Sequence, residues 1–406
     1  MYIKRAIEDY VKEALKQFKV VEVYGSRQVG KSTMLNALLS DSWDKVTLDD
    51  EKELEMAVED RALFVKNHKL PLFIDEVQYA PELLRQIKLV ADSTDEMGRF
   101  CISGSQLLKL SSAVHESLAG RACTVEMTSL SLREIKRVGF SLPFVPDEDY
   151  INKRQESVNP YDDIWGVIFR GAMPALWNNQ SLNREIFYRS YLNTYISRDV
   201  SEILDVKSQR MFLKFLRILA SQVSTVLNMS SIANDIQVSV NTVREWISVL
   251  QHIGIIRLLY PFESNLSKRL IKSPKVYFMD TGLVCYLVGW NSVRNACFGA
   301  DSGKLFENFV VSEVFKSFLN SGMETDNLFF YRDKEGREID LLILCDNVFY
   351  PVEIKRSTKP VSSDAKHFPV LSKFTDKNIG RGTILCQCDK KLILSDDLIA
   401  LPIEFI

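Results

Sequence analysis

The sequence predicts an α/β fold in which a parallel sheet lies between layers of helices. Short apolar runs alternate with helical patterns over residues 19–130, an order typical of parallel strands joined by helices. Two motifs, GSRQVGKS and FIDEVQ, stand at the ends of two of these runs. In such sheets, ligands bind at the carboxyl ends of the strands. Because the chain has 406 residues, we expect further domains beyond this sheet.

The first motif, Gly25–Ser32, matches the pattern G-x-x-x-x-G-K-[ST] in full. The apolar run KVVEVY precedes it and the helical pattern STMLNALL follows, which is the strand-loop-helix context that this phosphate-binding motif requires. The glycines allow backbone N–H groups to surround phosphates, and the start of the helix adds its positive end. We expect Lys31 to reach the β- and γ-phosphates and Ser32 to offer its hydroxyl to Mg²⁺. The predicted cofactors are therefore ATP and Mg²⁺.

The second motif places two acids after the apolar strand predicted within KLPLFIDEVQ. We expect Asp75 to hold the Mg²⁺ shell and Glu76 to orient and polarise the attacking water. An adjacent acid pair at a strand end is typical of P-loop enzymes that hydrolyse their nucleotide, and a nucleotide kinase would not need it. The alternative is a pair of solvated acids.

A third strand is predicted at residues 99–106, RFCISGSQ. A polar side chain at its end would lie beside the γ-phosphate, and Ser103 or Ser105 is the candidate; the alternative is an ordinary turn. Arg121 follows the helical stretch LLKLSSAVHESLAG. An arginine there can project into a neighbouring subunit's nucleotide site and neutralise transition-state charge. This interpretation predicts a homo-oligomer, whereas the alternative is a surface or structural arginine.

These motifs resemble a prokaryotic AAA-type, STAND-like ATPase family whose members carry a C-terminal domain of uncharacterised function. The resemblance rests on GSRQVGKS, LFIDEVQ, CISGSQ, SLAGRA and SLSLREI, and it runs through nearly all of the chain. The family's loop usually reads G-x-R-Q-x-G-K-[ST], and Arg27 and Gln28 are kept here. The resemblance implies that Arg121 is an arginine finger. The predicted nucleotide contacts of the loop are Gly25, Ser26, Arg27, Gln28, Val29, Gly30, Lys31, Ser32 and Thr33.

Four parts are predicted along the chain. Residues 1–140 form the P-loop ATPase domain, 141–206 a linker and helical lid, 207–282 a winged helix-turn-helix and 283–406 a nuclease-like α/β domain. The resemblance places a Gly-x-x-Pro turn at the start of the lid, within FRGAMPALW, and implies that Pro174 packs near the adenine. An ordinary interhelical turn is the alternative.

The winged helix-turn-helix is predicted from the order of its elements. The helical pattern QRMFLKFLRILASQV precedes a short helix, SSIANDIQ, with Ser231 as its N-cap, and a longer helix, VNTVREWISVLQHIG. Apolar strands then flank the basic stretch NLSKRLIKSPK. The alternative is a rigid protein–protein or interdomain module, which Glu245 and the net charge of −2 favour. If the unit bound duplex DNA, the predicted contacts are Asn241, Thr242, Arg244, Lys268 and Arg269.

The C-terminal part carries a constellation like that of PD-(D/E)xK nucleases, and the resemblance implies a restriction-endonuclease-like character. Glu307 lies on a predicted helix, Asp340 on a strand, and Glu353 and Lys355 on the next strand, where they share one face. Asp340 and Glu353 could hold Mg²⁺, Lys355 could position the water, and Glu307 could complete the metal shell. The alternative is a salt-bridged structural face.

The composition and the cysteine content indicate in which cellular compartment the protein is expected. The chain is 46% hydrophobic and 26% charged, as in globular proteins, and no run of about 18 apolar residues predicts a membrane span. The N-terminal pattern MYIKRAIEDYVKEALKQF is an amphipathic helix without the features of a signal peptide. The seven cysteines are scattered, as in a reducing compartment. We therefore expect a cytoplasmic protein.

The combined hypothesis is an ATP hydrolase that uses Mg²⁺ and drives a winged-helix and nuclease-like output. Two alternatives stay open at this level. One is a Mg²⁺-dependent nuclease that ATP switches. The other is a non-cleaving DNA-binding or signalling adaptor in which slow ATP turnover acts as a timer.

Overall fold

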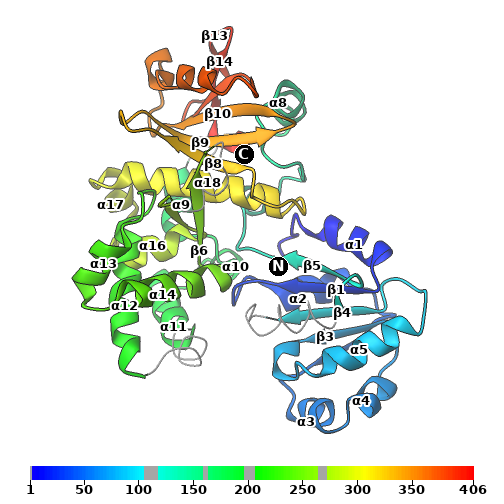
Figure 1. Cartoon of the computed structure of the whole chain (residues 1–406). Coiled ribbons are helices and arrows are strands. Elements are labelled where there is room, and N and C mark those ends of the chain that lie inside the picture. The colour runs from blue at the N-terminus through cyan, green and yellow to red at the C-terminus, as the bar shows by residue number, and fades with distance from the viewer. Residues whose placement is uncertain (1, 105–117, 159–162, 196–205, 264–271) are drawn as a thin grey trace.

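A computed structural model of the chain describes residues 2–104, 118–158, 163–195, 206–263 and 272–406. The molecule has two separate sheets, and helices lie beside and between them (Figure 1). The N-terminal segment builds the smaller sheet and its covering helices. The middle helices lie beside it, and the C-terminal segment forms most of the larger sheet.

The smaller sheet is parallel, as predicted, with the strand order β2-β3-β4-β1-β5. The central strand β1 pairs with β4 and β5, so that Val20 lies beside both Phe100 and Ala122. This register brings the carboxyl ends of the strands to one edge. The five strands are β1 (Val20–Tyr24), β2 (Asp44–Thr47), β3 (Leu72–Asp75), β4 (Phe100–Gly104) and β5 (Ala122–Glu126).

Helices cover both faces of this sheet because its strands are apolar on both sides. Val21 and Val23 face a cluster with Val11 and Met34, which come from α1 (Glu8–Gln17) and α2 (Lys31–Leu38). Val20 faces the opposite cluster. The helices on that side are α3 (Glu51–Glu59), α4 (Arg61–Asn67) and α5 (Leu83–Asp92). After β5, the short helix α7 spans Leu132–Ile135.

Three helices and a two-stranded ribbon follow one another in the order expected for a winged helix. Asn228 caps α13 by accepting from the N–H of Ser231 at 3.0 Å, so the predicted cap at Ser231 is wrong by three positions. Ser239 caps α14 by accepting from the N–H of Thr242 at 3.0 Å. The elements are α12 (Val206–Ser221), α13 (Met229–Ile236), α14 (Val240–His252), β6 (Ile256–Pro261) and β7 (Lys275–Phe278).

The ribbon also belongs to the larger sheet, which has nine strands in the order β13-β14-β12-β10-β9-β8-β6-β7, with β11 paired to β10. Strand β6 pairs antiparallel with β7 and parallel with β8, where Tyr260 lies opposite Phe329. The C-terminal strands are β8 (Leu328–Arg332), β9 (Glu338–Cys345), β10 (Val348–Ile354), β11 (Asn378–Ile379), β12 (Gly382–Cys386), β13 (Leu392–Ser395) and β14 (Leu398–Pro402).

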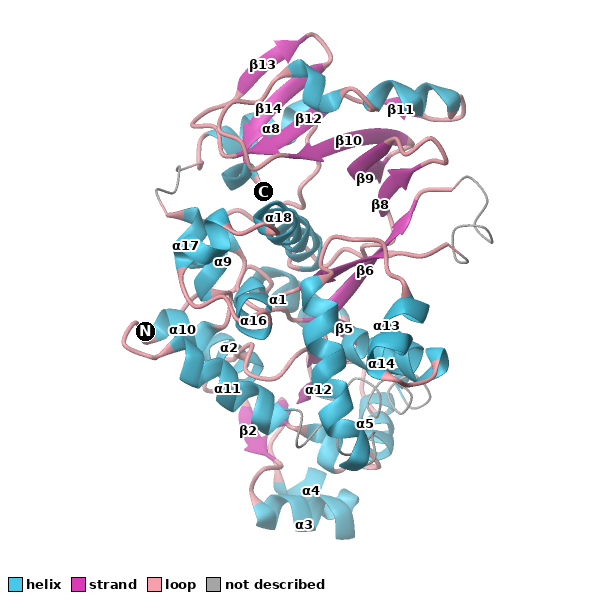
Figure 2. Cartoon of the chain, turned by 90° about the vertical axis from the view of Figure 1, so that its left-hand side faces the viewer, coloured by secondary structure: helices cyan, strands magenta, loops and turns pink. Residues whose placement is uncertain are grey.

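A long helix, α18 (Ser302–Leu319), lies between this sheet and the middle helices (Figure 2). It is buried along nearly its whole length, and one apolar cluster that includes it extends from Leu132 to Ile406. The helices of residues 163–195, the helices and ribbon of residues 206–278 and the C-terminal segment therefore share one core. The remaining helices are α8 (Glu148–Gln155), α9 (Ile164–Arg170), α10 (Pro174–Asn178), α11 (Arg184–Tyr195), α16 (Thr281–Leu287) and α17 (Val293–Phe298).

Part of the segment predicted as a linker is folded onto the end of the chain. The hydroxyl of Tyr150 on α8 donates to the carbonyl of Phe405 at 2.6 Å, and Arg154 donates to the carbonyl of Glu404 at 2.7 Å. In the described residues, no helix has both the length and the apolar character needed to cross a membrane.

Candidate nucleotide-binding site

The loop of the first motif joins the end of β1 to the start of α2, at the carboxyl edge of the parallel sheet. Gly25 and Gly30 both have positive φ, at 154° and 91°. A Cβ on Gly25 would lie 2.1 Å from the carbonyl oxygen of Met127, which follows β5. Glycine is therefore required at this position for the close approach of two backbones as well as for the turn.

Lys31 at the start of α2 folds back onto its own loop. Its Nζ donates to the carbonyls of Gly25 and Ser26, both at 2.9 Å, and its side chain is buried. An ammonium in this position is close to where the loop would surround phosphates. Phosphate oxygens could take the place of these two carbonyls, because both are acceptors for the same donor.

Asp75 and Ser103 meet at the carboxyl ends of β3 and β4. The hydroxyl of Ser103, a fully buried residue, donates to Oδ1 of Asp75. Glu76 follows with φ at 57°, and its Oε2 accepts a hydrogen bond from the side-chain amide of Gln78. The structure thus brings Asp75 and Ser103 together, whereas the side chain of Glu76 contacts Gln78. Ser105, the other candidate, lies outside the described residues.

Arg121 lies at the opposite edge of the sheet, just before β5 begins. Its carbonyl accepts from the N–H of Val20, the first residue of β1, so the arginine is separated from the loop by the length of a strand. Its guanidinium pairs with Asp92 and donates to the carbonyl of Ala119 at 2.9 Å. In this position Arg121 does not serve the nucleotide site of its own chain.

Pro174 approaches the loop from the middle helices. Its Cγ lies 3.9 Å from the position that a Cβ on Gly30 would occupy. Asp280 fixes the turn before it, because its Oδ2 accepts from the N–H of Ala172 and its Oδ1 from the hydroxyl of Tyr188, each at 2.7 Å. The sequence reasoning did not find Asp280, which lies 106 positions after Pro174 in a different segment.

Arg5 holds the back of the loop and was not predicted. Its guanidinium donates to the carbonyls of Val29 and Thr128, each at 2.7 Å, and Nε lies 2.9 Å from Oε1 of Glu134. Glu134 also closes a capping box with Ser131 at the start of α7. The S-x-x-E spacing in SLSLREI is a signal that could have identified Glu134. No local pattern marks Arg5.

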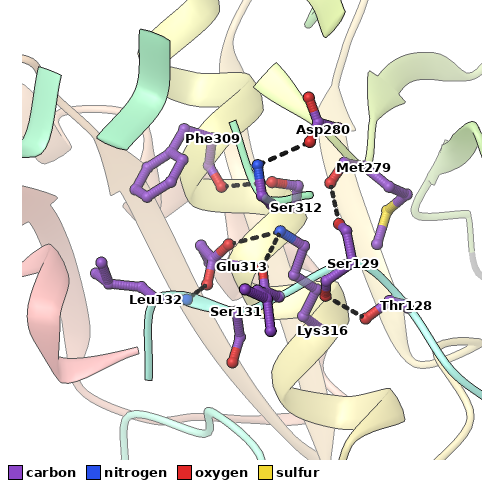
Figure 3. A network of polar contacts seen from close by, with 12 residues as sticks. Thr128, Ser129, Ser131, Leu132, Met279, Asp280, Phe309, Ser312, Glu313 and Lys316 are labelled. Atoms are coloured by element: carbon purple, nitrogen blue, oxygen red, sulfur yellow. Dashed lines mark hydrogen bonds and ion pairs between the residues drawn. The ribbon is translucent and has the colours of Figure 1, made fainter. Parts of the chain in front are cut away.

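The segment between β5 and α7 contacts helix α18 through a buried ion pair (Figure 3). Lys316 donates to Glu313 at 2.8 Å and to the carbonyl of Leu130 at 3.0 Å. Glu313 in turn accepts from the N–H of Leu132 at 2.6 Å. Both side chains are at most 4% exposed. Helix α18 thus holds the backbone that follows the last strand of the parallel sheet.

The end of helix α14 contacts the loop directly. The hydroxyl of Ser26 donates to the carbonyl of Ile253 at 2.8 Å, at the end of α14. Gly254 follows with φ at 70°, and a Cβ there would lie 2.7 Å from the Ser26 hydroxyl. Nearby, Arg257 on β6 pairs with Glu126 at the end of β5. No sequence pattern predicts these contacts.

The predicted DNA-contacting residues of α14 lie at the surface. Asn241 and Arg244 are exposed, and Arg244 donates to the side chain of Asn241 at 2.9 Å. Thr242 lies in the first turn, where its hydroxyl is 2.8 Å from that of Ser239. Arg244 and Lys272 line a groove of about 830 Å³ between α14 and the ribbon. Lys268 and Arg269 lie outside the described residues.

The predicted nuclease-like residues come from α18, from β9 and from the end of β10. Oδ2 of Asp340 accepts from the N–H of Ile354 at 2.9 Å, and Lys355 donates to Glu353 at 2.6 Å. Burial raises the pKa of Glu307 to about 7, and burial together with the charge of Asp340 raises that of Glu353 to about 7. Nevertheless, no three His, Cys, Asp or Glu side chains in the described ranges are grouped so that they could hold a metal ion.

Comparison with protein families assigns a known type to the first part only. Residues 17–136 match a family described as an AAA domain, and this range includes the loop, Asp75, Ser103 and Arg121. Residues 161–294 and 302–406 match two families described as domains of unknown function, DUF8612 and DUF4143.

Relatives cover most of the chain. Uncharacterised proteins of Mycobacterium tuberculosis and Mycobacterium bovis are each 27% identical over 97% of this chain and 82% of their own length. An uncharacterised protein of Methanocaldococcus jannaschii is 23% identical over 73% of this chain and 68% of its own. A solved Walker-type ATPase of Pyrococcus abyssi is 17% identical over 69% of this chain and 94% of its own, with a TM-score of 0.41.

Proposed function

We propose that this AAA-type ATPase hydrolyses ATP with Mg²⁺ and uses the nucleotide state of its loop to move the winged-helix and C-terminal segments. The observation that carries the proposal is the assembly of Lys31, Asp75 and Ser103 at one edge of the parallel sheet, inside the part that matches the AAA domain. Lys31 would bind the β- and γ-phosphates, and Ser103 holds the Asp75 carboxylate in place.

Mg²⁺ fits this donor set. The hydroxyl of Ser32 and the carboxylate of Asp75 are oxygen donors of the kind that Mg²⁺ prefers, and few protein ligands suffice because phosphates and water supply the rest. When bound, the ion would neutralise charge on the phosphates. Glu76 stands beside Asp75 and would orient the attacking water, with Gln78 holding its carboxylate.

Two substitutions separate nucleotide binding from hydrolysis. Lys31→Ala should lose ATP binding, because it removes the charge that pairs with the phosphates. Glu76→Gln should bind ATP but release phosphate at least about 100-fold more slowly, since a catalytic base contributes about that much or more. Calorimetric titration with ATP and a phosphate-release assay measure the two steps. Wild-type turnover in either variant would refute the proposal.

The coupling is proposed from the contacts of the loop with other segments. Ser26 bonds to the end of α14, and Arg5 joins Val29 of the loop to Glu134. Glu313 on α18 accepts from the N–H of Leu132, which lies two positions before Glu134. If Lys31 leaves Gly25 and Ser26 to bind phosphate, the loop, and with it these contacts, must adjust. The expected output lies at α14 or α18.

A homo-oligomer is proposed from the position of Arg121. This arginine lies a strand length away from its own loop. If it acts on a nucleotide, that nucleotide is bound by a neighbouring chain, and Arg121 must then leave its pair with Asp92. Turnover per chain should then rise with protein concentration, and Arg121→Ala should abolish this rise. Turnover that is independent of concentration and of Arg121 would indicate a monomeric enzyme.

A second candidate function is a Mg²⁺-dependent nuclease or, without cleavage, a DNA-binding adaptor. The convergence of Glu307, Asp340, Glu353 and Lys355 favours the nuclease, and the exposed Arg244 beside a groove favours DNA binding. Plasmid and single-stranded substrates with Mg²⁺ or Mn²⁺ test cleavage, with Asp340→Ala as the inactive reference. Salt-sensitive binding of duplex DNA without cleavage would indicate the adaptor.

A further inference from the structure

Lys275, from the winged-helix ribbon, reaches into the acidic cluster of the C-terminal segment. Its Nζ lies 3.0 Å from Oε1 of Glu307 and 2.6 Å from Oε1 of Glu338. The lysine side chain is 3% exposed, so its charge is withdrawn from water. Strand β7 therefore delivers a cation to a site whose carboxylates come from α18 and β9.

The electrostatics of the cluster keep this lysine charged. Burial alone would lower the pKa of Lys275, but the charges of Glu307, Asp340 and Glu338 more than offset this effect and raise the pKa above its usual value. A buried ammonium is tolerated only when carboxylates surround it in this way. The lysine and the acids therefore depend on each other for their charged forms.

The acids are also occupied by other donors. Oε1 of Glu307, which pairs with Lys275, accepts a second bond from the hydroxyl of Tyr277 at 2.8 Å. Tyr277 and Lys275 lie two positions apart on β7, on the same face of the strand. A metal ion entering the cluster would have to displace a lysine and a tyrosine hydroxyl that are fixed to the same strand.

We propose that Lys275 is an internal cation that keeps divalent metal ions out of the acidic cluster of Glu307, Glu338 and Asp340. Strand β7 holds the lysine in this position. This inference rests on the nuclease-like interpretation of the cluster and is independent of ATP hydrolysis. Withdrawal of β7 would uncover the carboxylates of Glu307 and Asp340 for a metal ion.

The test is Mn²⁺ binding to the nucleotide-free full-length protein, measured by calorimetric titration and by the melting temperature with and without MnCl₂. We expect wild type to bind no Mn²⁺ in this cluster. Lys275→Gln should gain Mn²⁺ binding and melt at a higher temperature when MnCl₂ is present. Adding Glu307→Gln to Lys275→Gln should remove this gain, because it removes a metal ligand.

The matched control is Lys272→Gln, which removes a lysine that lies close to Lys275 in sequence, is 49% exposed and pairs with Glu263. It should behave as wild type. Binding of Mn²⁺ to wild type that Glu307→Gln abolishes would overturn the proposal, as would a folded Lys275→Gln protein without any Mn²⁺ response. If Lys275→Gln folds only with MnCl₂, the proposal is supported; if it folds in neither condition, the proposal fails, because a metal ion then cannot replace the lysine. ATP turnover plays no part in these outcomes.

Discussion

Glu22 is an acid in the middle of the central strand β1, where it is only 2% exposed. Burial raises the pKa of its carboxyl from 4.5 to about 7, in spite of a hydrogen bond from Thr124. The folded state therefore binds the proton more tightly than the unfolded state, and stability falls as the pH rises from 4.5 through 7.

The substitution Glu22→Gln should remove this dependence. At pH 8.5 the variant should exceed wild type in free energy of unfolding by as much as about 3 kcal/mol, and below pH 4.5 the two should be equal. Urea denaturation across this pH range measures the difference. Glu59→Gln, at an exposed position, is the control. A constant difference between Glu22→Gln and wild type at all pH values would contradict the assigned pKa.

At the scale of single residues, the sequence predicts a candidate nucleotide site because the chemistry of such a site is contained in short motifs. Lys31, Asp75 and Ser103 follow directly from loop and strand patterns, and the structure brings Asp75 and Ser103 into contact. Arg5 and Lys275 could not be found in this way. Each acts on residues far along the chain, and a lone basic side chain carries no spacing that indicates its partner.

At the scale of elements, the contact of the C-terminal end of α14 with the loop depends on Gly254. Gly254→Ala places a Cβ 2.7 Å from the Ser26 hydroxyl and adds a side chain at φ 70°. We expect a loss of about 1–2 kcal/mol in stability from the left-handed backbone alone. We also expect ATP binding to weaken by about tenfold, or about 1.4 kcal/mol, because the phosphate-binding loop must shift.

Gly289→Ala separates the two effects. Gly289 has a similar φ of 78°, and no atom lies within 4 Å of the position of its Cβ. It should lose a comparable amount of stability and retain full ATP affinity in the same calorimetric titration. Equal ATP affinity in the two variants would show that the contact between Ser26 and Ile253 does not influence the nucleotide.

At the scale of elements, helices and strands were predictable where apolar periodicity and caps are local. The pattern identified strands β1, β3 and β4 and helices α12, α13 and α14. It missed the pairing of β6 with β8, because that pairing joins two strands about 70 positions apart. For the same reason, the sequence separated the ribbon from the sheet to which it belongs.

The Glu313–Lys316 pair is a feature of the whole molecule, because it joins α18 to the segment that follows the parallel sheet. Lys316→Met should lower the free energy of unfolding by about 3–5 kcal/mol, since it leaves the buried Glu313 without its cation. The double variant Lys316→Met with Glu313→Gln should lose less than Lys316→Met alone. Urea denaturation measures all three proteins.

The control lies on the same helix. Lys304 pairs with Asp301 at 2.8 Å, but both side chains are more than 40% exposed. Lys304→Met should therefore change the free energy of unfolding by no more than about 1 kcal/mol. If Lys316→Met had an equally small effect, the buried pair would not hold the two parts together.

Strand β6 pairs with β7 on one side and with β8 on the other, and this limits which segments of the chain can be deleted separately. Excision of α12–α14 together with β6 and β7 would leave β8 with an open edge, and unpaired edges recruit other chains into aggregates. Deletion of the C-terminal strands would leave β6 equally exposed. A gene rearrangement that preserved a soluble product would thus have to carry both segments together, as one heritable block.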